Sequence, residues 1–255
     1  MEKIEFQNRR GKILKGILYP APSKSSIIMA HGFTSDKYSR GRFPLLAEAF
    51  NKSGFNVLTF DFSGCGESDD DSINAEKEVE DLQSAINYAK SKGFRKIGLY
   101  GHSLGSLVCL KAYSGDIETM VLSGAGTGPM HYNWDEFFTM EQMNELAETS
   151  LITEKRNEPY RSEVVIEKQM LDDFASVNQE ELLSKVKCPV LIIHGDNKND
   201  EEELMLLENS KKGMDYLPTS SRLEVISGAT HSFMGHLDEL KALADTWYQK
   251  YLPKV

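Results

Sequence analysis

The sequence predicts an α/β protein in which a mostly parallel central sheet is covered by helices on both faces. Short, continuous apolar runs alternate along the chain with segments whose apolar residues recur at helical spacing. Such runs are typical of strands that are buried on both faces, and the amphipathic segments are typical of the helices that cover them. The chain has 255 residues, of which 40% are hydrophobic and 27% charged. This length and composition suit one large globular domain, so we expect a single domain over residues 1–255.

The predicted elements begin with a hairpin and continue as alternating strands and helices. The hairpin turns at Gly11, with Ile4 and Phe6 before it and Ile13, Ile17 and Leu18 after it. Asn74 is a suitable N-cap for one of the helices that follow. In chain order we expect a strand at 27–30, a helix at 43–50, a strand at 55–60, a helix at 79–89, a strand at 96–100 and a helix at 104–112. Later strands are expected at 120–122, 190–193 and 222–226, with a closing helix at 237–251.

The alternation lapses between residues 126 and 185, after the sixth predicted strand. The segment is rich in large apolar side chains, namely Tyr132, Trp134, Phe137, Phe138, Met140 and Met143. An insertion at this point would lie over the carboxyl ends of the strands, where ligands bind in open α/β sheets. We therefore expect a lid or cap over the site. Two interpretations of its aromatic residues remain open: they line an apolar pocket, or they form a small core of their own.

Charge and composition exclude several classes of partner. The formal net charge is −10, which argues against binding to nucleic acid or to an anionic membrane surface, because both favour a basic face. No apolar run approaches the ~20 residues that a membrane span needs, and no secretory signal is evident at the N-terminus. The three cysteines show neither disulfide nor metal-ligand spacing. We expect a cytoplasmic protein without a metal site.

The segment Gly101-His102-Ser103-Leu104-Gly105 stands between a predicted strand and a predicted helix. A G-x-S-x-G at such a junction is typical of a nucleophile elbow, a sharp turn that exposes the serine hydroxyl above the sheet edge. The pattern also occurs by chance in roughly one chain in ten of this length. The alternative is a glycine-rich turn with a capping serine. The surrounding elements favour the first interpretation, with Ser103 as the nucleophile of a hydrolase.

A serine nucleophile needs a histidine to accept its proton. Of six histidines, His231 is the best candidate, because it lies in a loop between the last predicted strand and the closing helix. That loop lies at the same end of the sheet as Ser103. His31 and His194 each end a predicted strand and are expected to be structural. His102 lies within the elbow itself and cannot turn back onto its neighbour.

The carboxylate that orients the histidine should follow the strand at 190–193, since the expected order is serine, acid, histidine. Asp196 and Asp200 compete for this role. Asp196 lies close to the strand end, where aspartates often bind their own backbone. Asp200 lies further along the loop with room to reach His231, and we favour it. The acidic run at 201–203 is expected to be a solvated helix start.

Acyl transfer also needs two amides that stabilise the developing oxyanion. One is expected from Leu104, the residue after the nucleophile. The other is expected from Phe33, in the segment His31-Gly32-Phe33-Thr34 that follows an early strand. The alternative for this second segment is an ordinary turn after a strand.

These residues together resemble the α/β-hydrolase superfamily and, within it, the bacterial cinnamoyl (feruloyl) esterase-like group. The matching segments span nearly the whole chain: 31–34, 61–68, 101–105, 188–196 and 230–233. The resemblance implies carboxylic ester hydrolysis through an acyl-enzyme, without a cofactor and often in a homodimer. Ser103 and His231 match the family's catalytic positions. The family usually has its catalytic aspartate where this chain has Lys198, and a two-residue insertion would leave Asp200 as the equivalent.

The expected function is therefore that of a serine carboxylesterase acting on small carboxylic esters, hydroxycinnamoyl esters among them. A monoacylglycerol lipase, a thioesterase or a small peptidase would use the same parts. A non-catalytic ligand-binding protein of this fold is the alternative from another class. Only the irregular loop around Lys198 supports that alternative.

Overall fold

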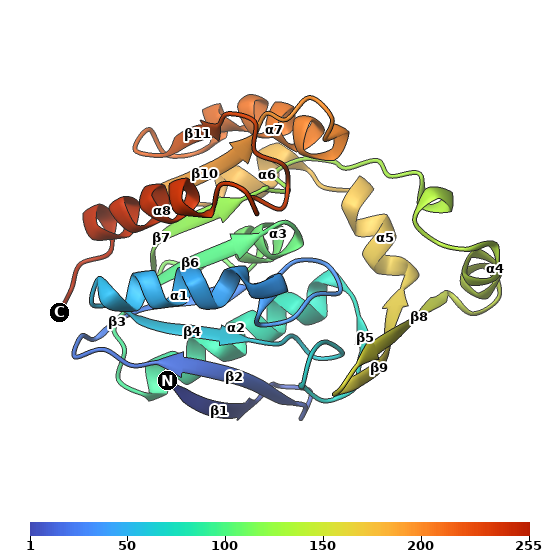
Figure 1. The fold of residues 1–255 in the computed structure, drawn as a ribbon, viewed down its shortest axis with the longest axis horizontal. Coiled ribbons are helices and arrows are strands. Elements are labelled where there is room, and N and C mark those ends of the chain that lie inside the picture. The colour runs from blue at the N-terminus through green and yellow to red at the C-terminus, as the bar shows by residue number, and fades with distance from the viewer.

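The computed structural model describes residues 1–255 and is built on an eight-stranded mixed sheet (Figure 1). In spatial order its strands are β1 (Glu2–Gln7), β2 (Ile13–Tyr19), β4 (Asn56–Phe60), β3 (Ser25–Ala30), β6 (Lys96–His102), β7 (Ile117–Ser123), β10 (Val190–Gly195) and β11 (Arg222–Ile226). The pairs β1–β2 and β2–β4 are antiparallel, and every later pair is parallel. The sheet is therefore not purely parallel, because the opening hairpin joins its edge.

Helices cover both faces of this sheet (Figure 1). One face packs against α1 (Arg42–Lys52) and α8 (Leu237–Tyr251), and the other against α2 (Ala75–Ser91), α3 (Leu104–Lys111) and α7 (Glu201–Gly213). The central strands are apolar throughout because both faces are covered; all six residues of β3 are buried. Asn74 caps α2 as the sequence predicts, its side chain accepting a hydrogen bond from the Lys77 amide at 2.8 Å. None of the helices has the length and apolar character needed to cross a membrane.

The segment between β7 and β10 follows the sixth strand of the sheet and has regular structure of its own. It contains η2 (Trp134–Glu136), α4 (Met140–Thr149), β8 (Leu151–Glu158), β9 (Arg161–Glu167), α5 (Lys168–Ala175) and α6 (Gln179–Ser184). The β8–β9 hairpin pairs with the two-residue β5 (Ser72–Ile73) as a second, three-stranded sheet. This hairpin and α4 extend to one side of the main sheet, on the right of Figure 1. No residue of α4 is buried.

The β8–β9 hairpin is tied to the loops that follow β3 and β4. Arg156 Nη2 donates a hydrogen bond to the Thr34 carbonyl at 3.1 Å, and the Tyr160 hydroxyl pairs with Asp36 Oδ2 at 3.0 Å. Arg161, which is buried, donates from Nε to the Gly66 carbonyl at 2.9 Å. Contacts of this kind hold the hairpin across the carboxyl ends of the first parallel strands.

Candidate active site

Ser103 lies in the sharp turn between β6 and α3. Its backbone has φ 55° and ψ −126°, a region that non-glycine residues rarely occupy and that is found mainly where function requires it. The flanking glycines allow this turn. A Cβ on Gly101 would lie 2.6 Å from the Gly105 carbonyl oxygen, and a Cβ on Gly105 would lie 2.2 Å from the Ala30 carbonyl oxygen. A side chain at Gly101 would clash with the first turn of α3, and one at Gly105 would force the turn away from β3.

His231 comes from the loop between β11 and α8, and the structure brings it to Ser103. Its Nε2 lies 2.9 Å from Ser103 Oγ. The imidazole is only 19% exposed and packs against Gly124, just after β7, where an added Cβ would lie 2.7 Å from the ring. The serine and the histidine that the sequence singles out therefore lie within hydrogen-bonding distance.

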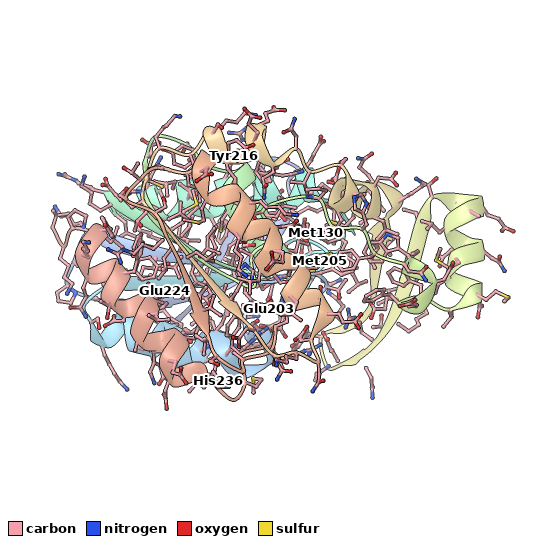
Figure 2. The ribbon with its side chains drawn as sticks, turned by 90° about the horizontal axis from the view of Figure 1, so that it is seen from above. Met130, Glu203, Met205, Tyr216, Glu224 and His236 are labelled. Carbon is pink, nitrogen blue, oxygen red and sulfur yellow. The ribbon has the colours of Figure 1, made fainter.

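The carboxylate against the His231 ring is Glu203, in the first turn of α7. Its Oε2 accepts a hydrogen bond from His231 Nδ1 at 2.6 Å, and its Oε1 accepts from His194 Nδ1 and from the Gly195 amide, each at 2.8 Å. Glu203 is fully buried, and Figure 2 labels it near the start of α7. Because a carboxylate only accepts hydrogen bonds, the His231 proton lies on Nδ1 and leaves Nε2 free to accept from Ser103.

Asp200 does not contact the His231 ring, contrary to the prediction from sequence. It is the N-cap of α7: its Oδ1 accepts from the Glu203 amide at 3.1 Å, and its Oδ2 accepts from the backbone amide of His231 at 2.7 Å. The helix begins directly after Asp200, so its carboxylate is occupied by two backbone donors. Asp196 is likewise engaged with the backbone, accepting from the Gly228 amide at 2.6 Å. Both aspartates hold the histidine loop rather than the imidazole.

Sequence reasoning missed Glu203 because it treated residues 201–203 as one solvated run. Only Glu201 is exposed; Glu203 shares the buried face of α7 with Leu206, Leu207 and Ser210. The spacing of these residues is the helical period, and a carboxylate on the apolar face of a helix is rarely left unpaired. The helical period that places Glu203 on the apolar face is therefore the sequence signal that points to this residue.

The charges of Glu203 and His231 shift each other's pKa. Burial alone would raise the pKa of Glu203, but the hydrogen bonds from His194 and His231 lower it to about 2, so the carboxylate is ionised at neutral pH. For His231, burial works against the charged form, yet the hydrogen bond and the negative charge of Glu203 raise the pKa above its ordinary value of 6.5. The glutamate therefore favours the imidazolium that forms when a serine gives up its proton.

Two backbone amides lie close to Ser103. Gly32 packs so closely that an added Cβ would lie 3.2 Å from Ser103 Cβ, which brings the following residue, Phe33, beside the nucleophile. The Phe33 amide donates to no other backbone group. The Leu104 amide is the first of α3, where helical amides have no partner within the helix. The predicted amide donors therefore both flank Ser103.

The remaining histidines of the strand ends have defined partners. His31 Nδ1 pairs with the Gly32 carbonyl at 2.9 Å, and its Nε2 accepts from the Phe62 amide at 3.2 Å. This supports the loop that carries Phe33. His194, fully buried, contacts Glu203 as described, while its Nε2 lies 2.8 Å from Ser210 Oγ. His194 was expected to be structural, and the structure places it against the carboxylate that binds His231.

Aromatic side chains extend from Phe33 into the segment between β7 and β10. The ring of Phe33 meets Phe174 edge-on at 5.7 Å between centroids, and Phe174 meets Tyr132 at 5.5 Å and Trp134 at 5.7 Å. Trp134 in turn lies 5.9 Å from Phe138. These rings form one continuous aromatic cluster that begins at the predicted oxyanion loop.

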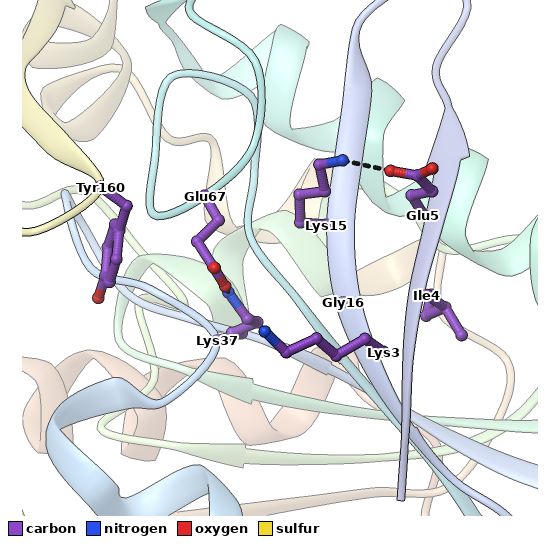
Figure 3. A pocket seen from close by; sticks show the side chains of 8 residues that line it. All are labelled: Lys3, Ile4, Glu5, Lys15, Gly16, Lys37, Glu67 and Tyr160. Atoms are coloured by element: carbon purple, nitrogen blue, oxygen red, sulfur yellow. Dashed lines mark hydrogen bonds and ion pairs between the residues drawn. The ribbon is translucent and has the colours of Figure 1, made fainter.

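A pocket of about 570 Å³ lies elsewhere, between β1, β2 and the tip of the β8–β9 hairpin (Figure 3). It is lined by Lys3, Ile4, Glu5, Lys15, Gly16, Lys37, Glu67 and Tyr160. The charged groups in it largely pair with each other, as Lys15 does with Glu5 and Lys37 does with Glu67. Neither Ser103 nor His231 lines this pocket. No group of three or more metal-ligating side chains is placed to hold a metal ion.

Comparison with known proteins agrees with this fold. The α/β-hydrolase GrgF from Penicillium sp. sh18 superposes with a TM-score of 0.77 at 17% identity, covering 98% of each chain. Est1E from Butyrivibrio proteoclasticus, solved with ferulic acid bound, superposes with a TM-score of 0.75 at 20% identity, covering 97% of this chain and 98% of that one. The chain has the α/β-hydrolase fold.

Sequence relatives place it within that fold. The thiohydrolase apmlB of Arthrinium phaeospermum is 31% identical over 147 residues, which is 52% of this chain and 45% of the relative. The chain thus aligns with less than half the length of that relative. The model of the hydrolase family described as "Serine aminopeptidase, S33" matches residues 21–238. On the extent of this match, the chain belongs to the serine aminopeptidase S33 (Hydrolase_4) family of hydrolases.

Proposed function

We propose that the protein is a serine hydrolase that cleaves carboxylic esters through an acyl-enzyme, with Ser103, His231 and Glu203 as its catalytic triad. The hydrogen-bonded chain from Ser103 Oγ to His231 Nε2, and from His231 Nδ1 to Glu203 Oε2, carries the proposal. Nucleophile, base and acid stand in the order and geometry that acyl transfer needs. The acid is a glutamate from a helix rather than the aspartate expected in the preceding loop.

In this mechanism Ser103 Oγ attacks the ester carbonyl while His231 Nε2 takes its proton. The negative charge that forms on the carbonyl oxygen is stabilised by the amides of Phe33 and Leu104. Collapse of this intermediate expels the alcohol, which receives the proton from His231, and leaves the acyl group on Ser103. Water, deprotonated by His231, then releases the acid and restores the serine. Glu203 holds the imidazole in the required tautomer throughout, and no cofactor takes part.

For the acyl group we propose small apolar or aromatic acids, hydroxycinnamoyl groups among them. The aromatic cluster from Phe33 to Trp134 supports this, because such rings bind planar apolar groups by stacking and edge contacts. Est1E, which has the same fold, binds ferulic acid. In this proposal residues 126–185 act as the lid, with the tied hairpin as its fixed part and the exposed α4 as its mobile part.

A thioester is the second candidate substrate. Two relatives are named thiohydrolases: apmlB of Arthrinium phaeospermum, which aligns with this chain at 31% identity, and aneE of Aspergillus aculeatus, which aligns at 32%. The same triad and amide donors would cleave a thioester, since the tetrahedral intermediate is similar and the thiolate leaves more readily than an alkoxide. Comparing matched oxygen and sulfur esters of one acid would separate the two. A monoacylglycerol lipase or a small peptidase remains a prediction of the same site.

Turnover of p-nitrophenyl acetate and p-nitrophenyl butyrate tests the proposal. We expect wild-type protein to hydrolyse both and Ser103→Ala to lose at least ~10³ in kcat, because loss of a triad serine removes the covalent route. A fluorophosphonate probe should label wild-type protein at Ser103 and leave Ser103→Ala unlabelled. A folded wild-type protein that neither turns over esters nor reacts with the probe would support the non-catalytic alternative. The predicted homodimer is checked by size-exclusion chromatography with light scattering, and the predicted cytoplasmic location by cell fractionation.

A further inference from the structure

Arg42, the first residue of α1, is a buried cation without a carboxylate partner. The residue is only 7% exposed, and no aspartate or glutamate forms an ion pair with its guanidinium. Burial lowers the pKa of Arg42, but a guanidinium remains protonated at neutral pH. Burying such a charge is unfavourable unless hydrogen bonds replace its water. The position of those hydrogen bonds therefore indicates what the residue does.

The guanidinium joins the two segments that carry the reacting groups. Arg42 Nη1 donates to His102 Nε2 at 2.8 Å and to the Ser232 carbonyl, also at 2.8 Å. His102 precedes the nucleophile Ser103, and Ser232 follows the base His231. One nitrogen of Arg42 thus connects the elbow with the histidine loop.

The other side of the guanidinium is held by a strained turn. Arg42 Nε donates to the Ser39 carbonyl at 3.0 Å, and Nη2 donates to Ser39 Oγ at 2.9 Å. Ser39 and Arg40 have φ values of 45° and 56°, which non-glycine residues rarely adopt. Asp36 accepts from the Ser39 amide at 2.9 Å and stabilises this turn. Strain of this kind persists where the surrounding contacts require one conformation, and here it presents Ser39 to Arg42.

The contact with Arg42 decides the protonation of His102. A guanidinium only donates, so His102 Nε2 accepts and the ring carries its proton on Nδ1, from which it donates to Ser123 Oγ at 3.0 Å. The rings of His102 and His231 lie 5.1 Å apart. Burial, then the charge of Arg42, then that of His231 place the pKa of His102 well below its ordinary value. The charged groups around the two rings are Glu202, Glu203, Asp200, Arg40 and Arg42.

We propose that Arg42 is a positioning residue that joins the elbow to the histidine loop and keeps His102 neutral with its proton on Nδ1. Only His231 then exchanges a proton with Ser103, although a second histidine lies beside it. The inference rests on the proposed hydrolase function, because it concerns how that site is arranged. Arg42 forms no hydrogen bond with Ser103 or the His231 ring and acts through His102 and Ser232.

The test uses Arg42→Met, with Arg42→Lys as the charge-preserving variant and Arg40→Met as the matched control for loss of a nearby surface charge. Nitrogen-15 NMR of the histidine rings from about pH 5 to about pH 8 reports their tautomers and titration. In wild type and Arg40→Met we expect His102 to stay neutral with its proton on Nδ1. In Arg42→Met we expect the His102 ring to populate both neutral tautomers and its pKa to rise toward the ordinary value of ~6.5.

Ester hydrolysis gives the second readout. We expect Arg42→Met to lower kcat about 10²-fold, with KM changed less than threefold, because misplacing the serine and the histidine by about an ångström costs that much. The acid limb of its pH–rate profile should move to higher pH, since removing a cation near His231 makes protonation of that ring easier. Arg42→Lys should keep the wild-type limb and lose less activity.

Three results would overturn the inference. They are a wild-type His102 that carries its proton on Nε2, a wild-type His102 that is protonated above about pH 6, and an Arg42→Met variant with the wild-type pH profile and histidine spectrum. The first two need no variant, so they hold even if Arg42→Met fails to fold. Fluorophosphonate labelling of Ser103 is read separately. A protein that does not label but shows the expected His102 spectrum would refute the hydrolase function and leave the arrangement of Arg42 intact.

Discussion

Glu203→Gln is the substitution that tests the assignment of the triad acid most directly. It keeps the length and shape of the side chain and replaces one of two acceptor oxygens by an NH₂ group, which donates. The carboxylate of Glu203 accepts three hydrogen bonds: two at Oε1, from His194 Nδ1 and the Gly195 amide, and one at Oε2, from His231 Nδ1. A glutamine cannot accept all three.

The most favourable orientation keeps the glutamine oxygen against the two donors at the Oε1 position. The NH₂ group then faces His231 Nδ1 and can be satisfied only if that nitrogen accepts. The His231 proton consequently moves to Nε2, where it blocks acceptance of the Ser103 proton. An inverted tautomer of this kind costs about 10⁴ in kcat in a serine protease, which corresponds to ~5.4 kcal/mol in the activation barrier.

We therefore expect Glu203→Gln to lower kcat by ~10³ to 10⁴, with a small effect on KM. Asp200→Asn is the matched control. An asparagine keeps one acceptor oxygen and can still cap α7, but it loses the hydrogen bond from the His231 amide. Neither carboxylate oxygen of Asp200 contacts the imidazole, so the tautomer of His231 is kept and we expect a loss of less than ~10-fold. The assay is p-nitrophenyl butyrate hydrolysis, with circular dichroism to show that both variants are folded. A Glu203→Gln variant within tenfold of wild type, or an Asp200→Asn variant as impaired as Glu203→Gln, would refute the reasoning.

Three further predictions concern pH, packing and stability. Because the pKa of His231 is raised above 6.5 and the base must be neutral, kcat/KM should rise with pH through a midpoint above ~6.5; a midpoint below 6 in a pH–rate profile would contradict this. Gly124→Ala places a Cβ 2.7 Å from the His231 ring, at a residue whose φ is 54°, so we expect at least a ~10²-fold loss of kcat. Wild-type steady-state rates in a correctly folded variant would disprove this. Glu78 is buried with both carboxylate oxygens unpartnered, and burial, with the charge of Asp81, raises its pKa well above the ordinary value. Its folded pKa exceeds its unfolded one, so the free energy of unfolding falls as pH rises from the unfolded pKa toward the folded one. Glu78→Met should therefore raise the free energy of unfolding by ~1–3 kcal/mol at neutral pH, and by less in acid. In thermal unfolding this would appear as a rise in Tm at pH 7 that is smaller at pH 4.5. A Tm at pH 7 below that of wild type would contradict the prediction.

Much of the main sheet was predictable because its signals are local. Strands such as β3 and β6 are short apolar runs, and the amphipathic helices between them show a clear period. The segment between β7 and β10 was not resolved into elements, because β8 and β9 carry charged residues on much of their length and are only partly buried. The pairing of β9 with the two-residue β5 is a contact across about 90 positions of the chain, which no local pattern encodes.

The sequence by itself predicted Ser103 and His231 as partners, and only the tertiary structure showed which carboxylate meets the His231 ring. The pattern of Gly101, Ser103 and Gly105 predicts the turn, although the close approach at Gly105 is to β3, and His231 follows from its place after the last strand. Which carboxylate meets His231 depends instead on where α7 begins and how it is rotated against the sheet. Capping by Asp200 starts the helix and directs Glu203 inward. This contact depends on packing between segments 28 residues apart, whereas spacing in the loop alone favoured Asp200, which caps the helix instead.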